Sequence, residues 1–312
     1  MELILNIVII ALLVLILVFT IFIGILVYNS IKSRKSLILL KQGKDYKDAK
    51  DYDNAIRCLE ESLKYINNVS AYYELGYIYY HQKNNIKLAE RYFKTCFEID
   101  RDFAPPHYSL GFIYFHDYHN PNAAIKELQA TIELSPNIAY PYNTLGIVYN
   151  DLKMYDAALT SVNKAIEIDQ GYAAAINNTG VIYANKGEYE KAVEMFKFAL
   201  TKEPNVPEFY NNLGNIYGIK LLDNLAIECF DKAIVYDCNN FLTYYWIGSL
   251  YLRNNGYQKA REYFEKSIAL NPDFAEGFFN LAITCNKLYD RENELKYFDI
   301  AVKLNPELLN DI

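Results

Sequence analysis

The chain has 312 residues, of which 52% are apolar and 22% charged, and its formal net charge is −7. An acidic chain without clusters of lysine and arginine is poorly suited to phosphate backbones, which argues against nucleic acid as its main ligand. Its five cysteines form no C-x-x-C pair and no regular spacing, which favours small buried thiols in a reducing compartment over a disulfide framework.

The first expected element is an apolar helix over residues 3–28. Between Leu3 and Val27 only Asn6 and Thr20 are polar, and a run of this length can cross a bilayer with some tilt. A cleaved signal peptide would need a basic start, a shorter apolar stretch and a small-residue cleavage site, and the sequence offers none of these. We therefore expect a transmembrane anchor.

The cations that directly follow this helix predict its orientation: Lys32, Arg34, Lys35, Lys41 and Lys44. Because positive residues stay on the cytoplasmic side, we expect a single-pass protein with its N-terminus outside and the rest in the cytoplasm, in a bacterial inner membrane. A solvated helix start, or contacts with anionic lipid headgroups, are alternative roles for these cations. Residues 29–35 would form a short basic connector that keeps the next domain close to the membrane.

A small residue then recurs at intervals of 33 to 35 residues: Gly43, Gly76, Gly111, Gly146, Gly180, Gly214, Gly248 and Ala282. A period in this range predicts stacked helical hairpins. Within each repeat, the small residue at position 8 and an alanine at position 20 allow two helices to approach closely. A large side chain at position 24 fills the space beside them, and a proline near position 32 ends the second helix.

These residues resemble the tetratricopeptide repeat (TPR) family. In the sixth repeat the matching residues are Tyr210, Leu213, Gly214, Tyr217, Ala226, Phe230 and Ala233, with Cys238 in place of proline. The resemblance implies an all-α fold, a right-handed superhelical α-solenoid of about eight hairpins, followed by a short tail at 309–312. The expected repeats span residues 36–68, 69–103, 104–138, 139–172, 173–206, 207–240, 241–274 and 275–308.

The resemblance also implies that the first helix of each hairpin lines a concave groove. The ligand-facing positions of repeats two and three are aromatic in this chain: Tyr73, Tyr77, Tyr80, Tyr108, Phe112 and Phe115. Exposed apolar patches commonly mark partner sites, and tyrosine is favoured at binding hot spots. The alternative is that these rings pack on one another across repeats and close the groove.

Asparagines follow the same helices in later repeats: Asn143, Asn177, Asn178, Asn211, Asn212 and Asn215. A side-chain amide both donates and accepts, so such a row can pair with the backbone of an extended peptide, similar to the asparagine ladder of some TPR arrays. The alternative is that asparagine is simply common at these positions in the family. The clamp that grips acidic chaperone tails needs cations in the groove, and no fifth position carries one, so we do not expect that ligand.

We expect no enzymatic activity and no cofactor or metal, because no catalytic or nucleotide motif appears and His116 and His119 fall in a solvated turn. Three roles stay open. The chain is a membrane-anchored scaffold that binds a protein or peptide in its groove, a structural subunit of a larger membrane complex, or a substrate-recruiting adaptor for a separate enzyme. A structural subunit would assemble through its convex face or its uncapped last repeat, where Val302 and Leu304 would mediate homo-oligomerisation.

Overall fold

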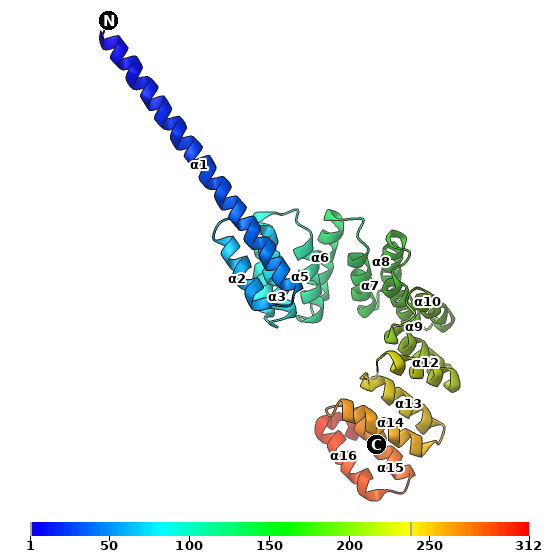
Figure 1. The fold of residues 1–312 in the computed structure, drawn as a ribbon. Coiled ribbons are helices and arrows are strands. Elements are labelled where there is room, and N and C mark those ends of the chain that lie inside the picture. The colour runs from blue at the N-terminus through cyan, green and yellow to red at the C-terminus, as the bar shows by residue number, and fades with distance from the viewer. Residues whose placement is uncertain (1, 238, 312) are drawn as a thin grey trace. The chain divides into compact units, whose positions relative to one another are not determined.

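The computed structural model describes residues 2–237 and 239–311, which form α-helices and one short 3-10 helix without any strand (Figure 1). The helices form eight consecutive pairs: α1 (Glu2–Asp48) and α2 (Tyr52–Leu63), α3 (Val69–His81) and α4 (Ile86–Ile99), α5 (Pro105–His116) and α6 (Pro121–Leu134), α7 (Ala139–Asp151) and α8 (Tyr155–Ile168), α9 (Ala173–Asn185) and α10 (Tyr189–Lys202), α11 (Pro207–Ile219) and α12 (Asp223–Tyr236), α13 (Phe241–Arg253) and α14 (Tyr257–Leu270), α15 (Ala275–Lys287) and α16 (Arg291–Leu304). The 3-10 helix η1 (Pro306–Asp311) ends the described chain. The predicted all-α array of helical hairpins is thus confirmed. Cys238, expected in the place of a proline, lies outside the described residues.

The array divides into two compact units, the first ending at Thr144 and the second beginning at Leu145. Each unit has buried clusters of its own. In the first, Leu59 and Leu75 pack in one cluster that joins consecutive hairpins. In the second, Phe196, Phe230 and Ile247 share another. Neighbouring hairpins within each unit therefore bury apolar residues against one another, as expected for a repeat array without a single central core.

In four hairpins a glycine of the first helix lies against a phenylalanine ring of the second helix, and this contact holds the two helices together. A Cβ atom at Gly214 would lie 2.7 Å from Cε1 of Phe230, and one at Gly180 would lie 2.6 Å from the equivalent atom of Phe196. Real Cβ atoms do not approach carbon this closely, so only glycine lets the ring of the second helix lie flat against the first. Both rings are about 1% exposed.

Each turn between the paired helices uses one residue in the left-handed region of backbone space. In the sixth hairpin this residue is Leu221, with φ of 59°, and in the seventh it is Asn255, with φ of 60°. The next backbone N–H then donates to a carbonyl of the first helix: Leu222 N to Tyr217 O at 2.9 Å, and Gly256 N to Tyr251 O at 2.8 Å. This hydrogen bond satisfies a helix-end carbonyl and fixes where the second helix begins.

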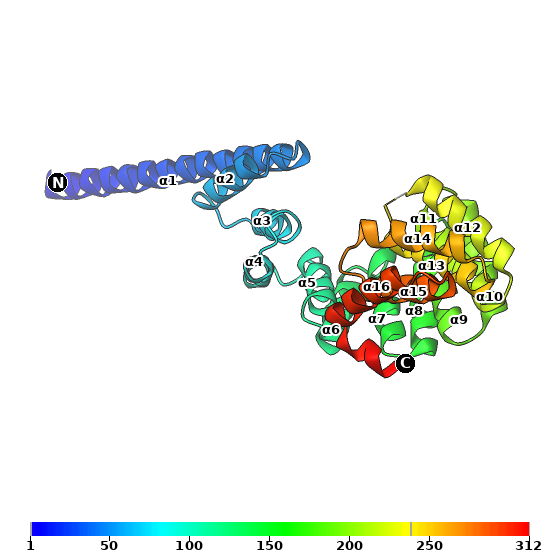
Figure 2. The same ribbon diagram turned by 90° about the horizontal axis from the view of Figure 1, so that it is seen from below.

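The first helix, α1, combines the expected anchor with the first helix of repeat one. It runs for 47 residues without interruption, or about 70 Å at 1.5 Å per residue, so residues 29–35 are helical. From Leu12 onward it is long and apolar enough to cross a membrane, and an 18-residue stretch of it has a mean hydropathy of 2.7 with no buried residue. Figures 1 and 2 both show its N-terminal part projecting beyond α2–α6. Its C-terminal part packs on α2, where Ser36 Oγ lies 2.9 Å from Ser62 Oγ.

The described cysteines are buried and unpaired: Cys58, Cys96, Cys229 and Cys285. Burial raises the pKa of the Cys96 thiol to about 12 and that of Cys229 to about 11. The thiols of Cys96 and Cys229 therefore hold little thiolate at neutral pH and act as small apolar side chains.

Two substitutions in α11 test the hairpin contact. Gly214→Ala should lower the free energy of unfolding by about 1–3 kcal/mol, because the added methyl overlaps the Phe230 ring. Gly218→Ala should leave stability unchanged or raise it by up to about 1 kcal/mol, because its Cβ would meet only Leu250 Cδ2, at 3.5 Å, and alanine favours the helix. Urea unfolding followed by circular dichroism measures both. Equal effects of the two variants would contradict the contact as described.

Candidate functional site

In the first unit, the predicted aromatic patch lies on α3 and α5. Tyr77 is 36% exposed, and the other predicted rings are half-buried. Tyr80 meets Phe112 edge to face, with ring centroids 6.2 Å apart, so the two helices share ring contacts across neighbouring hairpins. A small pocket of about 160 Å³ remains between them, lined by Tyr80, His81, Phe93, Tyr108, Ser109 and Phe112. The rings therefore pack on one another and still present part of their surface.

Polar partners fix the orientation of this patch. The Tyr80 hydroxyl donates to Asp117 Oδ2 at 2.7 Å, and burial together with this carboxylate raises the pKa of Tyr80. At the other edge, Lys47 Nζ lies 2.6 Å from Glu74 Oε2 and 5.1 Å from the centre of the Tyr77 ring. Because Glu74 also lies 3.5 Å from Lys44 Nζ, the carboxylate is held by two cations at the start of the array.

The structure corrects the expected asparagine row. Asn143, Asn177 and Asn211 are 6%, 1% and 4% exposed, so their amides face protein and not a ligand. Two of them bind the next hairpin: Asn177 Oδ1 accepts from Asn212 Nδ2, and Asn211 Oδ1 accepts from Thr243 Oγ1, both at 3.0 Å. Asn177 and Asn211 thus join consecutive first helices and have a structural role.

The remaining asparagines lie nearer the surface, and Asn212 and Asn215 line pockets that flank α11. Asn178, Asn212 and Asn215 are half-buried. One pocket, of about 460 Å³, is lined by Val181, Ala184, Asn185, Tyr189, Phe196, Asn212, Asn215, Ile216 and Ile219. The other, of about 190 Å³, is lined by Gly214, Asn215, Gly218, Ile219, Phe230, Trp246, Ser249, Leu250 and Arg253. Both are therefore formed mainly by first helices, have largely apolar walls and share Asn215 and Ile219 on α11. We call these the α9–α11 pocket and the α11–α13 pocket.

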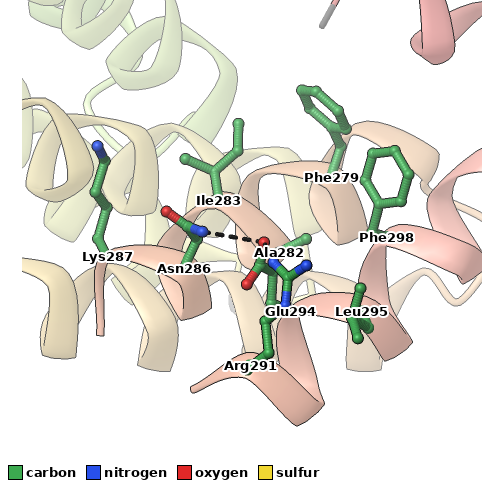
Figure 3. Close-up of a pocket in the computed structure, with 9 residues that line it drawn as sticks. All are labelled: Phe279, Ala282, Ile283, Asn286, Lys287, Arg291, Glu294, Leu295 and Phe298. Carbon is green, nitrogen blue, oxygen red and sulfur yellow. Dashed lines mark hydrogen bonds and ion pairs between the residues drawn. The ribbon is translucent and has the colours of Figure 1, made fainter. Parts of the chain in front are cut away.

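A third open surface lies on the last hairpin. Figure 3 shows the residues around a groove of about 530 Å³: Phe279, Ala282, Ile283, Asn286, Lys287, Arg291, Glu294, Leu295 and Phe298. Phe298 occupies position 24, where the rings of earlier hairpins are at most 1% exposed, yet it is half-buried. In an earlier hairpin the next first helix covers that ring, as Trp246 stacks on Phe230 with centroids 5.6 Å apart.

The predicted self-association residues do not line this groove. Leu304 is 39% exposed and Val302 is half-buried. Leu308 of η1 packs with Ala275, Phe278 and Ala301, so part of the hairpin end is covered. The apolar surface left open is centred on Ile283, Leu295 and Phe298.

Sequence reasoning missed the two pockets and the groove. One signal was visible for the groove: the last repeat carries Glu294 where the other repeats have alanine at position 20. Its Oε1 accepts from Asn286 Nδ2 at 3.0 Å and from Arg291 Nη1 at 2.6 Å, which places a charged network at one end of the groove (Figure 3). For the α11–α13 pocket, the signal was Gly218 at position 12, where a missing side chain leaves space.

The comparisons with known proteins agree with this architecture. A tetratricopeptide repeat model matches residues 69–103, 139–172 and 242–274, and a TPR repeat model matches residues 180–218. No curated protein sequence matches the chain. The chain thus contains tetratricopeptide repeats, and its first helix is a candidate membrane anchor.

Solved structures share the fold at low sequence identity. A tetratricopeptide repeat protein from Parabacteroides merdae is 15% identical with a TM-score of 0.65, over 86% of this chain and 99% of that one. Pseudomonas aeruginosa PilF is 21% identical with a TM-score of 0.58, over 66% of this chain and 93% of that one. Yeast Tom70 is 18% identical with a TM-score of 0.60, over 81% of this chain and 56% of that one. These likenesses show the fold alone.

Replacing single asparagines with alanine tests which of them have a structural role and which are accessible. Asn177→Ala should lower the free energy of unfolding by about 1–3 kcal/mol, because it removes the acceptor of the Asn212 amide in a buried site. Asn215→Ala, at the half-buried position shared by the two pockets, should change it by less than about 0.5 kcal/mol. Chemical unfolding of both variants measures this. A larger loss in Asn215→Ala would reverse the assignment of structural and accessible amides.

Proposed function

We propose that this protein is a membrane-anchored scaffold that binds an extended segment of a partner protein along the first helices of its hairpins. The observation that carries the proposal is the pair of adjacent pockets on either side of α11. Concave sites with apolar walls and a few polar groups are the usual places for ligands. The tetratricopeptide fold supports a role in protein–protein interaction.

An extended ligand suits these pockets better than a helical one. Packed helices lie about 8–10 Å apart, so pockets on both sides of one helix are separated by a similar distance. An extended chain spans it in about three residues, at roughly 3.3 Å each. Its unpaired backbone N–H and C=O groups can bind amides such as those of Asn185, Asn212 and Asn215, whereas a helix has already used its backbone groups.

The aromatic patch on α3 and α5 is a second contact surface in this proposal. Tyr77 and Phe112 offer ring faces beside the pocket between the two helices. Tyrosine combines a large apolar area with a polar tip at a low cost in side-chain entropy, which favours it at binding surfaces. The partner therefore carries apolar anchors for both units.

The anchor and its orientation belong to the same proposal. α1 would cross the membrane, and the cations that follow it, from Lys32 to Lys44, would hold the array on the cytoplasmic side. The bacterial inner membrane is the proposed location. A segment bound to the array would thus be recruited to the inner face of that membrane.

A second candidate function is assembly into a larger membrane complex through the last hairpin, which is favoured by the groove at Ile283, Leu295 and Phe298. Homo-oligomerisation is one form of this alternative. It differs from the first candidate in the surface used, and so a substitution in either surface separates them.

The binding proposal is tested with random 12-residue peptides displayed on phage and selected on the full chain held in nanodiscs. Gly218→Leu should weaken the selected peptides by at least about tenfold, or about 1.4 kcal/mol, because the new side chain fills the α11–α13 pocket. Glu228→Leu, which adds the same side chain to α12, is the matched control and should not affect them. If the selected peptides still bind the Gly218→Leu variant but no longer bind the Leu295→Asp variant, the binding site lies on the last hairpin instead.

The orientation is tested with reporters fused to the C-terminus. A reporter active only in the cytoplasm should be active, and one active only in the periplasm should not, because the cations after α1 stay inside. Replacing Lys32, Arg34 and Lys35 with neutral residues should reduce this preference. Activity of the periplasmic reporter on the unaltered chain would refute the proposed topology.

A further inference from the structure

The turn of the sixth hairpin departs from the other turns in its chemistry. All eight turns place one residue at positive φ, and in six of them it is lysine, asparagine, histidine or glycine: Lys50, Asn84, His119, Lys153, Gly187 and Asn255. The sixth hairpin uses Leu221 and the last uses Tyr289. Leucine has no polar side chain to stabilise a left-handed conformation, so Leu221 carries a conformational cost.

Packing does not compensate for this cost, because Leu221 is 71% exposed. Its neighbours Ile219, Leu222 and Leu225 are 55%, 42% and 43% exposed. We call these four residues the aliphatic turn. The residue equivalent to Ile219 is polar in every other repeat: Asp48, His81, His116, Asp151, Asn185, Arg253 and Lys287. The turn is apolar, exposed and strained, and packing does not offset its strain. These features point to a binding role.

The aliphatic turn is continuous with the two pockets. Ile219 lines both of them and is followed directly by the turn, so a chain that leaves either pocket along α11 meets Leu221 and Leu222. The charges around the turn are already paired: Lys220 Nζ lies 2.7 Å from Glu190 Oε1, and Arg253 pairs with Asp223. The surface is thus apolar and locally neutral, without the excess of cations that draws a segment to anionic lipid.

We propose that the partner segment passes from the pockets over the aliphatic turn and carries a further aliphatic side chain that packs on Leu221 and Leu222. This inference rests on the proposed function, since the segment must first occupy the pockets. The ligand is then a neutral, extended segment with aliphatic side chains in the pockets and an additional one at the turn. The conformational cost at Leu221 is retained because asparagine or glycine would remove the contact.

The test uses Leu221→Asn, with Tyr289→Asn as its matched control at the same position of the last hairpin, where Tyr289 is 96% exposed. Asparagine tolerates positive φ, so both variants should unfold at a higher temperature than wild type. Only Leu221→Asn should weaken the phage-selected peptide, by about fivefold, because it removes one apolar contact. A residue with a purely structural role would not give higher stability together with weaker binding.

The selected sequences provide the second readout. Peptides selected on wild type should share aliphatic residues at the pocket positions and at one position beyond them, and selection on Leu221→Asn should lose the preference at that last position alone. Peptides whose preferences and affinity are unchanged by Leu221→Asn would overturn the inference and leave the proposed function intact. Failure to select any peptide would instead count against the proposed function and, with it, this inference.

A fluorescence experiment tests whether the turn lies in the membrane instead. If brominated lipid in the nanodiscs quenches the tryptophan fluorescence of a Leu222→Trp variant more strongly than that of wild type, the turn lies in the membrane and the inference is overturned.

Discussion

The close approach of a glycine in the first helix of a hairpin to an apolar side chain in the second is the contact on which the rest of the structure depends. That side chain is a phenylalanine ring in four hairpins and Leu59, Leu128 or Val162 in three others. Phe230 lies so near Gly214 that a methyl group would overlap it, and the same geometry recurs at Gly180 and Phe196. This contact fixes the separation and rotation of the two helices. Because the next first helix packs on the same ring, the contact also fixes the step from one hairpin to the next.

A fold held from inside its hairpins leaves the outer positions of the first helices free to vary. In α11 the buried residues include Leu213, Gly214 and Ile216, whereas the less buried Asn215, Gly218 and Ile219 line two pockets. The same separation applies to the turns. Their backbone hydrogen bonds recur in every hairpin, but their side chains do not, and in the sixth hairpin they are aliphatic. Function can therefore change at these positions at little cost to the fold.

The fold was largely predictable because its determinants are local and repeated. The spacing of Gly43 through Ala282 is enough to predict hairpins, and the apolar run from Leu3 to Val27 is enough to predict a membrane-length helix. The candidate site was less predictable. Asn177 and Asn178 are adjacent in sequence, yet the first is buried and the second is half-buried, because the rotation of the helix about its axis decides which residue faces the next hairpin. Pockets depend on side chains from three helices, and composition alone does not reveal them.

The most direct test of the binding account is hydrogen–deuterium exchange of the full chain in nanodiscs, with and without a saturating phage-selected peptide. The account predicts slower exchange in α9, α11 and α13 and in the turn from Ile219 to Leu225, with α10 and the rest of α12 little changed, because the ligand lies on the first helices and pairs with their exposed groups. Slower exchange confined to α10 and α12, or to α15 and α16, would contradict it and assign binding to the second helices or to the last hairpin.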